Sequence, residues 1–222
     1  MIILFDLDGT LVDSVPDIAW SLNATLGEAG FERLSLDEVR MRVGDGAGQL
    51  LASALPKDVA TGTAESLLPR FLKHYEGHLS VDTMIYPGIV DLLNEQRAAG
   101  RALAVLTNKP AALARSLLTD LKLAPYFVAI VGDGDGFPRK PSPDAGRELI
   151  LRNARSFSDA LVVGDGLPDV RMARAIPCRS IAALWGYSSE SALRAEGPSH
   201  IARSVSELAT LLSSAELATN GS

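Results

Sequence analysis

Short apolar runs recur along the chain, and most end at a glycine, aspartate, asparagine or threonine. Within each run the apolar residues are consecutive, which is typical of parallel strands covered on both faces. Stretches of helical length separate the later runs, as in a chain that alternates strands with helices. We therefore expect an α/β fold with an open, doubly wound parallel sheet. Its strands are expected over residues 2–5, 102–106, 127–131, 160–163 and 180–184.

One long interval has no strand pattern and carries only helix signals. We expect Ser14 to cap a first helix that ends near Gly30. Further helices are expected over residues 36–43, 48–55 and 64–79. The pattern therefore predicts an inserted all-helical domain of residues 14–84 in an α/β core of residues 1–13 and 85–222. The last residues, 213–222, are small and polar, and we expect them to be frayed.

Two later helix starts carry capping signals. Ser142 precedes Pro143, which combines an N-cap serine with a proline at the first helical position. Ser204 lies three residues before Glu207 and is followed by the apolar Leu208, which is the pattern of a capping box. We expect a helix to begin directly after each serine.

The composition excludes several classes of protein. Of 222 residues, 47% are hydrophobic and 22% charged, as in ordinary globular domains. The net charge of −6 and the pI of about 5.1 disfavour a sequence-independent nucleic-acid binder. Cys178 is the single cysteine, so an intrachain disulfide is excluded. His74 and His78 are expected to be ordinary surface residues. Apolar stretches are too short for a membrane span, and Asp6 follows the start too closely for a signal peptide, so we expect a cytoplasmic protein without membrane partners.

Asp6 and Asp8 follow the first predicted strand directly. The period of a strand places both carboxylates on the same side, where they repel one another unless a cation or a proton lies between them. Gly9 allows the chain to turn sharply away from the strand. The alternative is that these aspartates only cap the following helix.

Polar residues also follow two later strands. Thr107 and Asn108 end the second strand, where a hydroxyl, an amide and free backbone N–H groups can hold a phosphate. Asp165 follows the fourth strand, and Asp169 lies one helical turn further on. The alternative in each case is that these residues cap helices.

Lys140 precedes a predicted helix start and could direct its ammonium at the ends of the neighbouring strands, although a lysine in a loop is commonly solvated. All of these residues lie at, or just beyond, the carboxyl ends of strands, where ligands bind in open α/β sheets. Asp6, Asp8 and Asp165 offer the hard oxygen ligands that suit Mg²⁺. A nucleophile, a metal site and groups that stabilise an oxyanion favour phosphoryl chemistry.

The sequence resembles the haloacid dehalogenase superfamily of phosphohydrolases. The resemblance rests on Asp6-Leu7-Asp8-Gly9-Thr10, Thr107-Asn108, Lys140-Pro141 and Gly164-Asp165 with Asp169, which match the motifs of that superfamily in order. It implies a Rossmann-like three-layer core with an inserted helical cap. Within the superfamily the chain looks most like the phosphoglycolate phosphatase group, on Asp13-Ser14, the cap segment 43–47, Tyr86-Pro87-Gly88, Lys140-Pro141-Ser142-Pro143 and Trp185-Gly186-Tyr187.

The resemblance implies a role for each matched residue. Asp6 would be the nucleophile that forms an aspartyl phosphate, and Asp8 the general acid and base. Thr107, Asn108 and Lys140 would stabilise charge on the transferring oxygens. The ligands of Mg²⁺ would be Asp6, the backbone carbonyl of Asp8, and Asp165, with Asp169 nearby. Gly166 and Pro168 depart from the family pattern, which usually has Ser or Thr and often Asn at these positions, and could weaken metal binding.

Substrate choice should come from the inserted domain closing over the strand ends. Gly44, Asp45 and Gly46 are the candidates for a loop that reaches the substrate, and the alternative is a plain turn between helices. Arg42 beside them could pair with a substrate carboxylate, although an arginine on a helix face is commonly solvated.

Three functions remain open at this stage. The first is a Mg²⁺-dependent phosphatase that hydrolyses a small phosphorylated metabolite, with 2-phosphoglycolate as the leading candidate. The second is a phosphosugar phosphatase or a mutase of the same superfamily that retains the phosphoryl group for transfer. The third is a non-catalytic module that binds a phosphorylated ligand, which Asp8 disfavours because a binder needs no general acid.

Overall fold

A parallel six-stranded sheet forms the centre of the protein in the computed structural model, which describes residues 1–214. Its strands lie in the spatial order β5 (Ala129–Asp133), β4 (Ala102–Pro110), β1 (Ile2–Phe5), β6 (Ala160–Gly164), β7 (Arg179–Ala183) and β8 (His200–Ala202). The predicted open parallel sheet is confirmed. The sequence pattern missed β8, because three residues at a sheet edge are too few to show a period. Most of the predicted frayed segment 213–222 lies outside the described residues.

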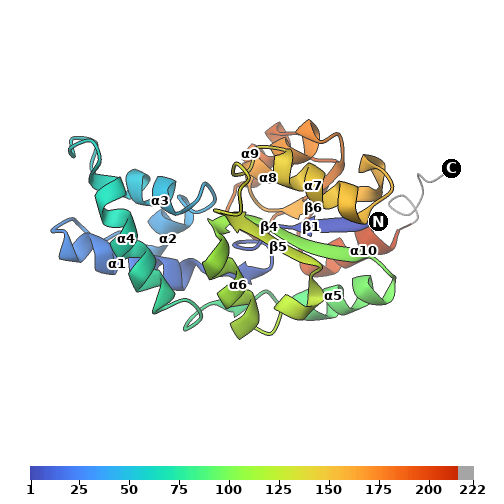
Figure 1. Ribbon diagram of the computed structural model, residues 1–222, viewed down its shortest axis with the longest axis horizontal. Coiled ribbons are helices and arrows are strands. Elements are labelled where there is room, and N and C mark those ends of the chain that lie inside the picture. The colour runs from blue at the N-terminus through green and yellow to red at the C-terminus, as the bar shows by residue number, and fades with distance from the viewer. Residues whose placement is uncertain (215–222) are drawn as a thin grey trace.

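Helices cover both faces of the sheet, as the uninterrupted apolar strands predict (Figure 1). Ile3 and Phe5 of β1 point to one face and Ile2 and Leu4 to the other, and all four are buried. The first face is covered by α5 (Ile89–Ala98), α6 (Ala111–Asp120) and α10 (Val205–Ser213), and the second by α7 (Asp144–Asn153) and α8 (Leu167–Ala175). The remaining core elements are α9 (Glu190–Ala195) and the short 3-10 helices η1 (Ala124–Tyr126) and η2 (Phe157–Asp159).

The interval after β1 is helical, and its helices lie beyond one end of the sheet (Figure 1). They are α1 (Val15–Glu28), α2 (Leu36–Arg40), α3 (Ala47–Ala54) and α4 (Thr63–Glu76). The chain leaves the core before α1 and returns to it after α4. The two passages pair with each other as a small antiparallel ribbon of β2 (Val12–Asp13) and β3 (Met84–Ile85). The sequence showed no strand here, because two residues carry no period.

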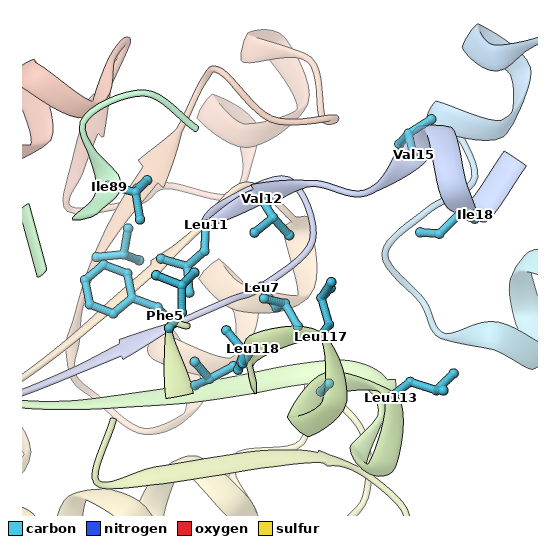
Figure 2. Close-up of a cluster of buried hydrophobic side chains, with 14 of the residues drawn as sticks. Phe5, Leu7, Leu11, Val12, Val15, Ile18, Ile89, Leu113, Leu117 and Leu118 are labelled. Carbon is cyan, nitrogen blue, oxygen red and sulfur yellow. The ribbon is translucent and has the colours of Figure 1, made fainter. Parts of the chain in front are cut away.

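One apolar cluster continues from the sheet into these helices. Phe5, Leu7 and Leu11 lead towards Val15 and Ile18 at the start of α1, as Figure 2 shows. Burial of apolar surface contributes roughly 25 cal/mol per Å². The cluster therefore ties the helices to the face of the sheet that also packs on α5 and α6.

The predicted helix starts are confirmed only in part. Ser204 accepts a hydrogen bond from Glu207 N at 3.1 Å and caps α10 as expected. Ser142 is one residue too early, because α7 begins after Pro143. Ser14 precedes α1 but makes no capping hydrogen bond, since its hydroxyl donates to Asp8 Oδ1 instead. Among the described helices, none is long and apolar enough to cross a membrane.

Candidate active site

The predicted site residues lie around the point where the strand order reverses. The chain runs from β1 to β4 and β5 on one side, then returns to β6 on the other side of β1. Loops that leave neighbouring strands in opposite directions open a crevice at the carboxyl edge of a parallel sheet. Asp6 follows β1 and Asp165 follows β6, so the two aspartates border this crevice.

A cavity lies between the strand ends and the inserted helices. The core contributes Asp6, Asp8, Thr107, Asn108, Lys109 and Pro110 to its lining, and the inserted segment contributes Ile18, Val43, Gly44, Gly46, Ala47, Leu50, Phe71 and Tyr75. Its core side is polar and charged, whereas the inserted helices present mainly apolar side chains. A small polar molecule with an anionic end is the kind of ligand that fits such a lining.

Asp6 is held in a fixed orientation by two donors. Its Oδ1 accepts from the backbone N–H of Leu7 at 2.7 Å and lies 2.8 Å from Lys140 Nζ. The same ammonium lies 2.7 Å from Asp169 Oδ1, and the side chains of Lys140 and Asp169 are 3% exposed. Lys140 therefore links Asp6, which follows β1, to Asp169, which follows β6.

Asp8 is held by a second lysine, which the sequence analysis gave no role. Lys109 Nζ lies 3.0 Å from Asp8 Oδ1 and 3.3 Å from Oδ2. The hydroxyl of Ser14 donates to Oδ1 at 2.5 Å. Lys109 also donates to the hydroxyl of Tyr75, which lies on α4. The carboxylate of Asp8 is thereby tied both to β4 and to the inserted helices.

Asp165 is fixed by neighbours from two other segments. Its Oδ1 accepts from the hydroxyl of Thr10 at 2.8 Å, and its Oδ2 from the backbone N–H of Tyr187 at 2.8 Å. A Cβ at Gly186 would lie 2.2 Å from Asp165 Cβ, so glycine is required for this close approach. Tyr187 also donates its hydroxyl to Asp13 Oδ1 at 3.1 Å.

Burial changes the proton affinities in this cluster. Burial, together with repulsion from Asp6, raises the pKa of Asp165 to about 8. Burial also raises the pKa of Asp169, although Lys140 opposes the rise. For Lys140 burial opposes the charge, but Asp169 and Asp6 outweigh it and raise the pKa of the ammonium above its ordinary value. The ammonium of Lys140 therefore stays protonated at neutral pH, whereas the buried carboxyl groups of Asp165 and Asp169 hold their protons more tightly than exposed ones.

The oxygen-rich cluster suits a divalent cation. Four carboxylates, those of Asp6, Asp8, Asp165 and Asp169, face two ammonium groups, and repulsion from Asp6 adds to the effect of burial in raising the pKa of Asp165. Hard cations such as Mg²⁺ prefer carboxylate and carbonyl oxygens. The residues present therefore fit a divalent metal ion, and Asp6 and Asp165 would hold it, with Asp169 close by.

The side chains of Thr107 and Asn108 differ in what they contact. Thr107 lines the cavity, and its hydroxyl accepts from the backbone N–H of Lys109 at 3.2 Å. The amide of Asn108 donates to the carbonyls of Gly44 and Lys140, each at 3.1 Å, and accepts from Lys140 N at 2.8 Å. The sequence analysis expected Asn108 to contact the transferring oxygens. Its side chain instead joins the loop of Gly44 to the backbone of Lys140.

The loop between α2 and α3 reaches the cavity at some of its predicted residues. Gly44 and Gly46 line the cavity, whereas Asp45 and Arg42 are not among the lining residues. The guanidinium of Arg42 donates to the carbonyls of Glu38 and Ser53, so it is directed along the inserted helices rather than at a ligand.

Arg139 closes over the same loop, donating to the Asp45 carbonyl at 2.9 Å. A Cβ at Gly46 would lie 2.6 Å from Arg139 Nη1, and the backbone φ there is +92°. Only glycine adopts this conformation without strain. The core therefore holds this loop through its backbone carbonyls.

Gly166 and Pro168, the departures from the family pattern, occupy the start of α8. The backbone N–H of Gly166 donates to Asp169 Oδ2 at 3.1 Å, which helps to fix that carboxylate. Pro168 lies in the first turn of α8, where a backbone N–H has no partner within the helix. Both residues leave the acids in place.

Another group of possible metal ligands lies away from this site. Asp17, His78 and Asp82 place their ligand atoms within 4.8 Å of one another. The carboxylate of Asp17 already accepts from Asp82 N, Thr83 N and the Thr83 hydroxyl. The expectation that His78 is an ordinary surface residue is wrong, because its ring stacks on Trp20 at 4.0 Å and its Nε2 lies 3.4 Å from buried Asp17.

The sequence analysis gave no role to several residues of the site, among them Lys109, Tyr75 and Thr10. A weak signal existed for Lys109, since it directly follows Thr107 and Asn108, which were predicted to hold a phosphate. Tyr75 follows Phe71 by one helical turn and is indistinguishable by pattern from a core aromatic residue. Its hydroxyl reaches Lys109 only through the packing of α4 on the core.

Comparison with known proteins gives a consistent result. Residues 3–183 match the model of the family described as haloacid dehalogenase-like hydrolase. The chain is 39% identical over 195 residues to the phosphoglycolate phosphatase of Rhodospirillum rubrum, covering 85% of this chain and 81% of that protein. It is 33% identical to that of Vibrio parahaemolyticus over 93% of both chains. The crystal structure of a predicted phosphoglycolate phosphatase from Haemophilus somnus superposes with a TM-score of 0.88 at 27% identity, covering 95% of this chain and 96% of that one.

Proposed function

Because this chain belongs to the haloacid dehalogenase-like hydrolase family, we propose that it is a phosphatase for a small phosphate monoester, with 2-phosphoglycolate as its substrate. The observation that carries the proposal is the cavity that brings Asp6 and Asp8 together beneath the inserted helices. The names of the relatives support the choice of substrate. Residues 14–84 would act as the cap of this cavity, and a cytoplasmic location stays a prediction.

Asp6 is the proposed nucleophile. One of its oxygens forms a bond to phosphorus while the bond between phosphorus and the ester oxygen breaks. Leu7 N and Lys140 Nζ hold Oδ1 at 2.7 Å and 2.8 Å, so the carboxylate does not need to reorient before the attack. Lys140 also places positive charge beside the transferring oxygens, and the hydroxyl of Thr107 lines the same space.

Asp8 is the proposed general acid and base. It gives a proton to the departing alkoxide oxygen and later takes a proton from the water that attacks the phosphorus of the aspartyl phosphate. The second attack breaks the bond to Asp6 and releases inorganic phosphate. Ser14 and Lys109 fix the Asp8 carboxylate on the side of the cavity where the leaving group must lie.

Mg²⁺ is the proposed cofactor, and when bound it would supply positive charge that offsets the phosphoryl oxygens. Asp6 and Asp165 would bind it through carboxylate oxygens and Asp8 through its backbone carbonyl. Thr10 and Tyr187 orient the Asp165 carboxylate for this purpose. The preference of Mg²⁺ for oxygen ligands supports it over softer metals.

The proposal is tested by measuring phosphate release from a panel of phosphate monoesters, with Mg²⁺ and with a chelator. We expect 2-phosphoglycolate to be hydrolysed fastest and the chelator to abolish turnover. A hexose 1-phosphate in the panel separates the mutase alternative, because a mutase returns an isomerised sugar phosphate instead of free phosphate. Tight binding of every ester without turnover would contradict the proposal and favour a binding module.

A further inference from the structure

Lys109 is a buried cation whose part in the proposed reaction, holding Asp8, leaves its contact with Tyr75 unexplained. It is 5% exposed and belongs to the last part of β4. Its ammonium contacts Asp8 at 3.0 Å and the hydroxyl of Tyr75, and all three residues line the cavity. A buried lysine is costly unless it is paired, and here Asp8 provides one charged partner while the other acceptor is a neutral phenol oxygen.

The other cations near the cavity are engaged elsewhere. Lys140 lies between Asp6 and Asp169, on the phosphoryl side. Arg42 and Arg139 donate to backbone carbonyls and are not among the lining residues. Among the residues that line the cavity in the described part of the chain, Lys109 is the one with a positive charge.

The surroundings of Lys109 offer little else to an anion. Ile18, Leu50 and Phe71 line the cavity from the inserted helices, and apolar side chains cannot replace the water that an anion loses on entering. A substrate whose leaving group carries a second negative charge therefore needs a donor at this end of the cavity. Lys109 and the hydroxyl of Tyr75 are placed there side by side.

We propose that Lys109 is a specificity-determining residue, whose ammonium binds a carboxylate on the leaving group of the phosphate ester, with the Tyr75 hydroxyl as the second donor. This inference rests on the proposed function, because it assigns the substrate class of the same cavity. The carboxylate takes the place that the Tyr75 oxygen now occupies as acceptor. Asp8 keeps its own contact and holds the ammonium in place.

Tyr75 suits the role of a neutral donor. Burial, together with the negative charge of Asp8, raises the pKa of its phenol well above the ordinary value, so the hydroxyl keeps its proton at neutral pH. A carboxylate is a stronger acceptor for an ammonium than a phenol oxygen. The exchange of partners therefore favours the substrate, and the Tyr75 O–H, which the contact with Lys109 does not engage, donates to the same carboxylate.

The test compares 2-phosphoglycolate with 2-hydroxyethyl phosphate, which replaces the carboxylate by a neutral hydroxymethyl group of similar size. In the wild type we expect kcat/KM to favour the carboxylate ester by about 10- to 100-fold, as for a hydrogen bond to a charged group. Lys109→Met should remove most of this ratio, and Tyr75→Phe should reduce it severalfold. Lys57→Met, which removes an exposed lysine from the inserted segment, is the matched control and should keep the ratio.

A general effect of Lys109 on Asp8 would give a different result. Lys109→Met would then lower kcat/KM for both esters by the same factor, which would overturn the assignment. Phosphate release from neither ester in the wild type would instead contradict the proposed function itself. The two failures are therefore distinguishable.

A binding measurement covers the case in which Lys109→Met is inactive. Both esters are titrated calorimetrically into Asp6→Asn and into Asp6→Asn with Lys109→Met, with circular dichroism as a check on folding. The preference for 2-phosphoglycolate should be present in the first protein and lost in the second. Equal Kd values for the two esters in Asp6→Asn, or a preference kept in the double variant, would overturn the inference. Asp6→Asn with Tyr75→Phe provides the same test if the lysine variant does not fold.

Discussion

Lys140 Nζ lies 2.7 Å from Asp169 Oδ1, and both side chains are buried. Removing one partner of a buried ion pair leaves the other charge uncompensated, which costs about 3–5 kcal/mol. We expect Lys140→Met to lower the free energy of unfolding by that order and phosphatase activity by about 100-fold or more. Urea denaturation and phosphate release measure the two effects. Lys57→Met is the control, and unchanged activity in Lys140→Met would contradict the role given to this ammonium.

Asp6→Asn removes the nucleophilic carboxylate but keeps its shape and its acceptor oxygen. We expect activity to fall by ~10³-fold or more, because an amide oxygen is a poor nucleophile, while the fold is retained. Phosphate release and circular dichroism check these two outcomes. The exposed Asp58→Asn is the control for loss of one acidic charge. Substantial turnover by folded Asp6→Asn would exclude the aspartyl-phosphate mechanism.

Asn108 joins the loop of Gly44 to the backbone of Lys140 through three hydrogen bonds. We expect Asn108→Ala to lower kcat/KM by roughly tenfold or more, since each lost bond to a buried group costs about 1–3 kcal/mol. Asn108→Asp should do the same, because a carboxylate cannot donate to the two carbonyls. Asn153→Ala removes an amide that donates to the Leu149 carbonyl on α7 and should leave the kinetics unchanged.

If Asn108 instead contacted the transferring oxygens, its loss would lower kcat with little effect on KM. Steady-state kinetics that separate kcat from KM therefore decide between the two roles.

Gly46 and Gly48 form a matched pair of glycines next to the cavity. A methyl group at Gly46 would meet Arg139 at 2.6 Å where φ is +92°, whereas nothing lies within 4 Å of a methyl group at Gly48. We expect Gly46→Ala to lose about 1 kcal/mol or more of stability and to raise KM. Gly48→Ala should gain about 0.5–1 kcal/mol, because it replaces a glycine inside α3. Thermal unfolding and KM measurements compare the two variants, and equal effects would contradict the role given to the Gly46 backbone.

The pKa of Asp165, raised from 3.8 to about 8, predicts how pH affects the metal-free protein. Between those values the folded state binds a proton that the unfolded state has released, so this group makes stability fall as pH rises from about 4 to 8. Asp165→Asn should flatten that fall in urea denaturation with a chelator present. Mg²⁺ should bind more tightly at pH 8 than at pH 6, since binding must release the proton. Mg²⁺ affinity independent of pH would contradict this account.

The strands and the acids at their ends could be predicted because both depend on local sequence. Ile2–Phe5 appears in the sheet with the predicted bounds, and Asp6 and Asp165 border the crevice as expected. An apolar run of this kind is buried on both faces in almost any fold that contains it. Polar residues directly after such runs must then meet at one edge of the sheet.

Roles that depend on distant contacts could not be predicted. Ser14 has the sequence context of a helix cap, but its hydroxyl donates to Asp8. Asn108 has the context of a phosphate ligand, but its amide is engaged by backbone groups 32 and 64 residues away. The local sequence indicates which hydrogen bonds a side chain is able to make. The packing of distant segments decides which partner lies close enough to make them.

The sequence by itself determined the α/β architecture, the inserted helical segment and the aspartates at the strand ends, because apolar periodicity and strand-end position are local properties. Only the tertiary structure decided that Lys109 joins Asp8 to Tyr75, across separations of 101 and 34 residues. Contacts of this kind arise when Tyr75 of α4 reaches the end of β4, and no pattern within either segment encodes them. The chemistry of the cavity is therefore a product of the packing between the strand ends and the inserted helices.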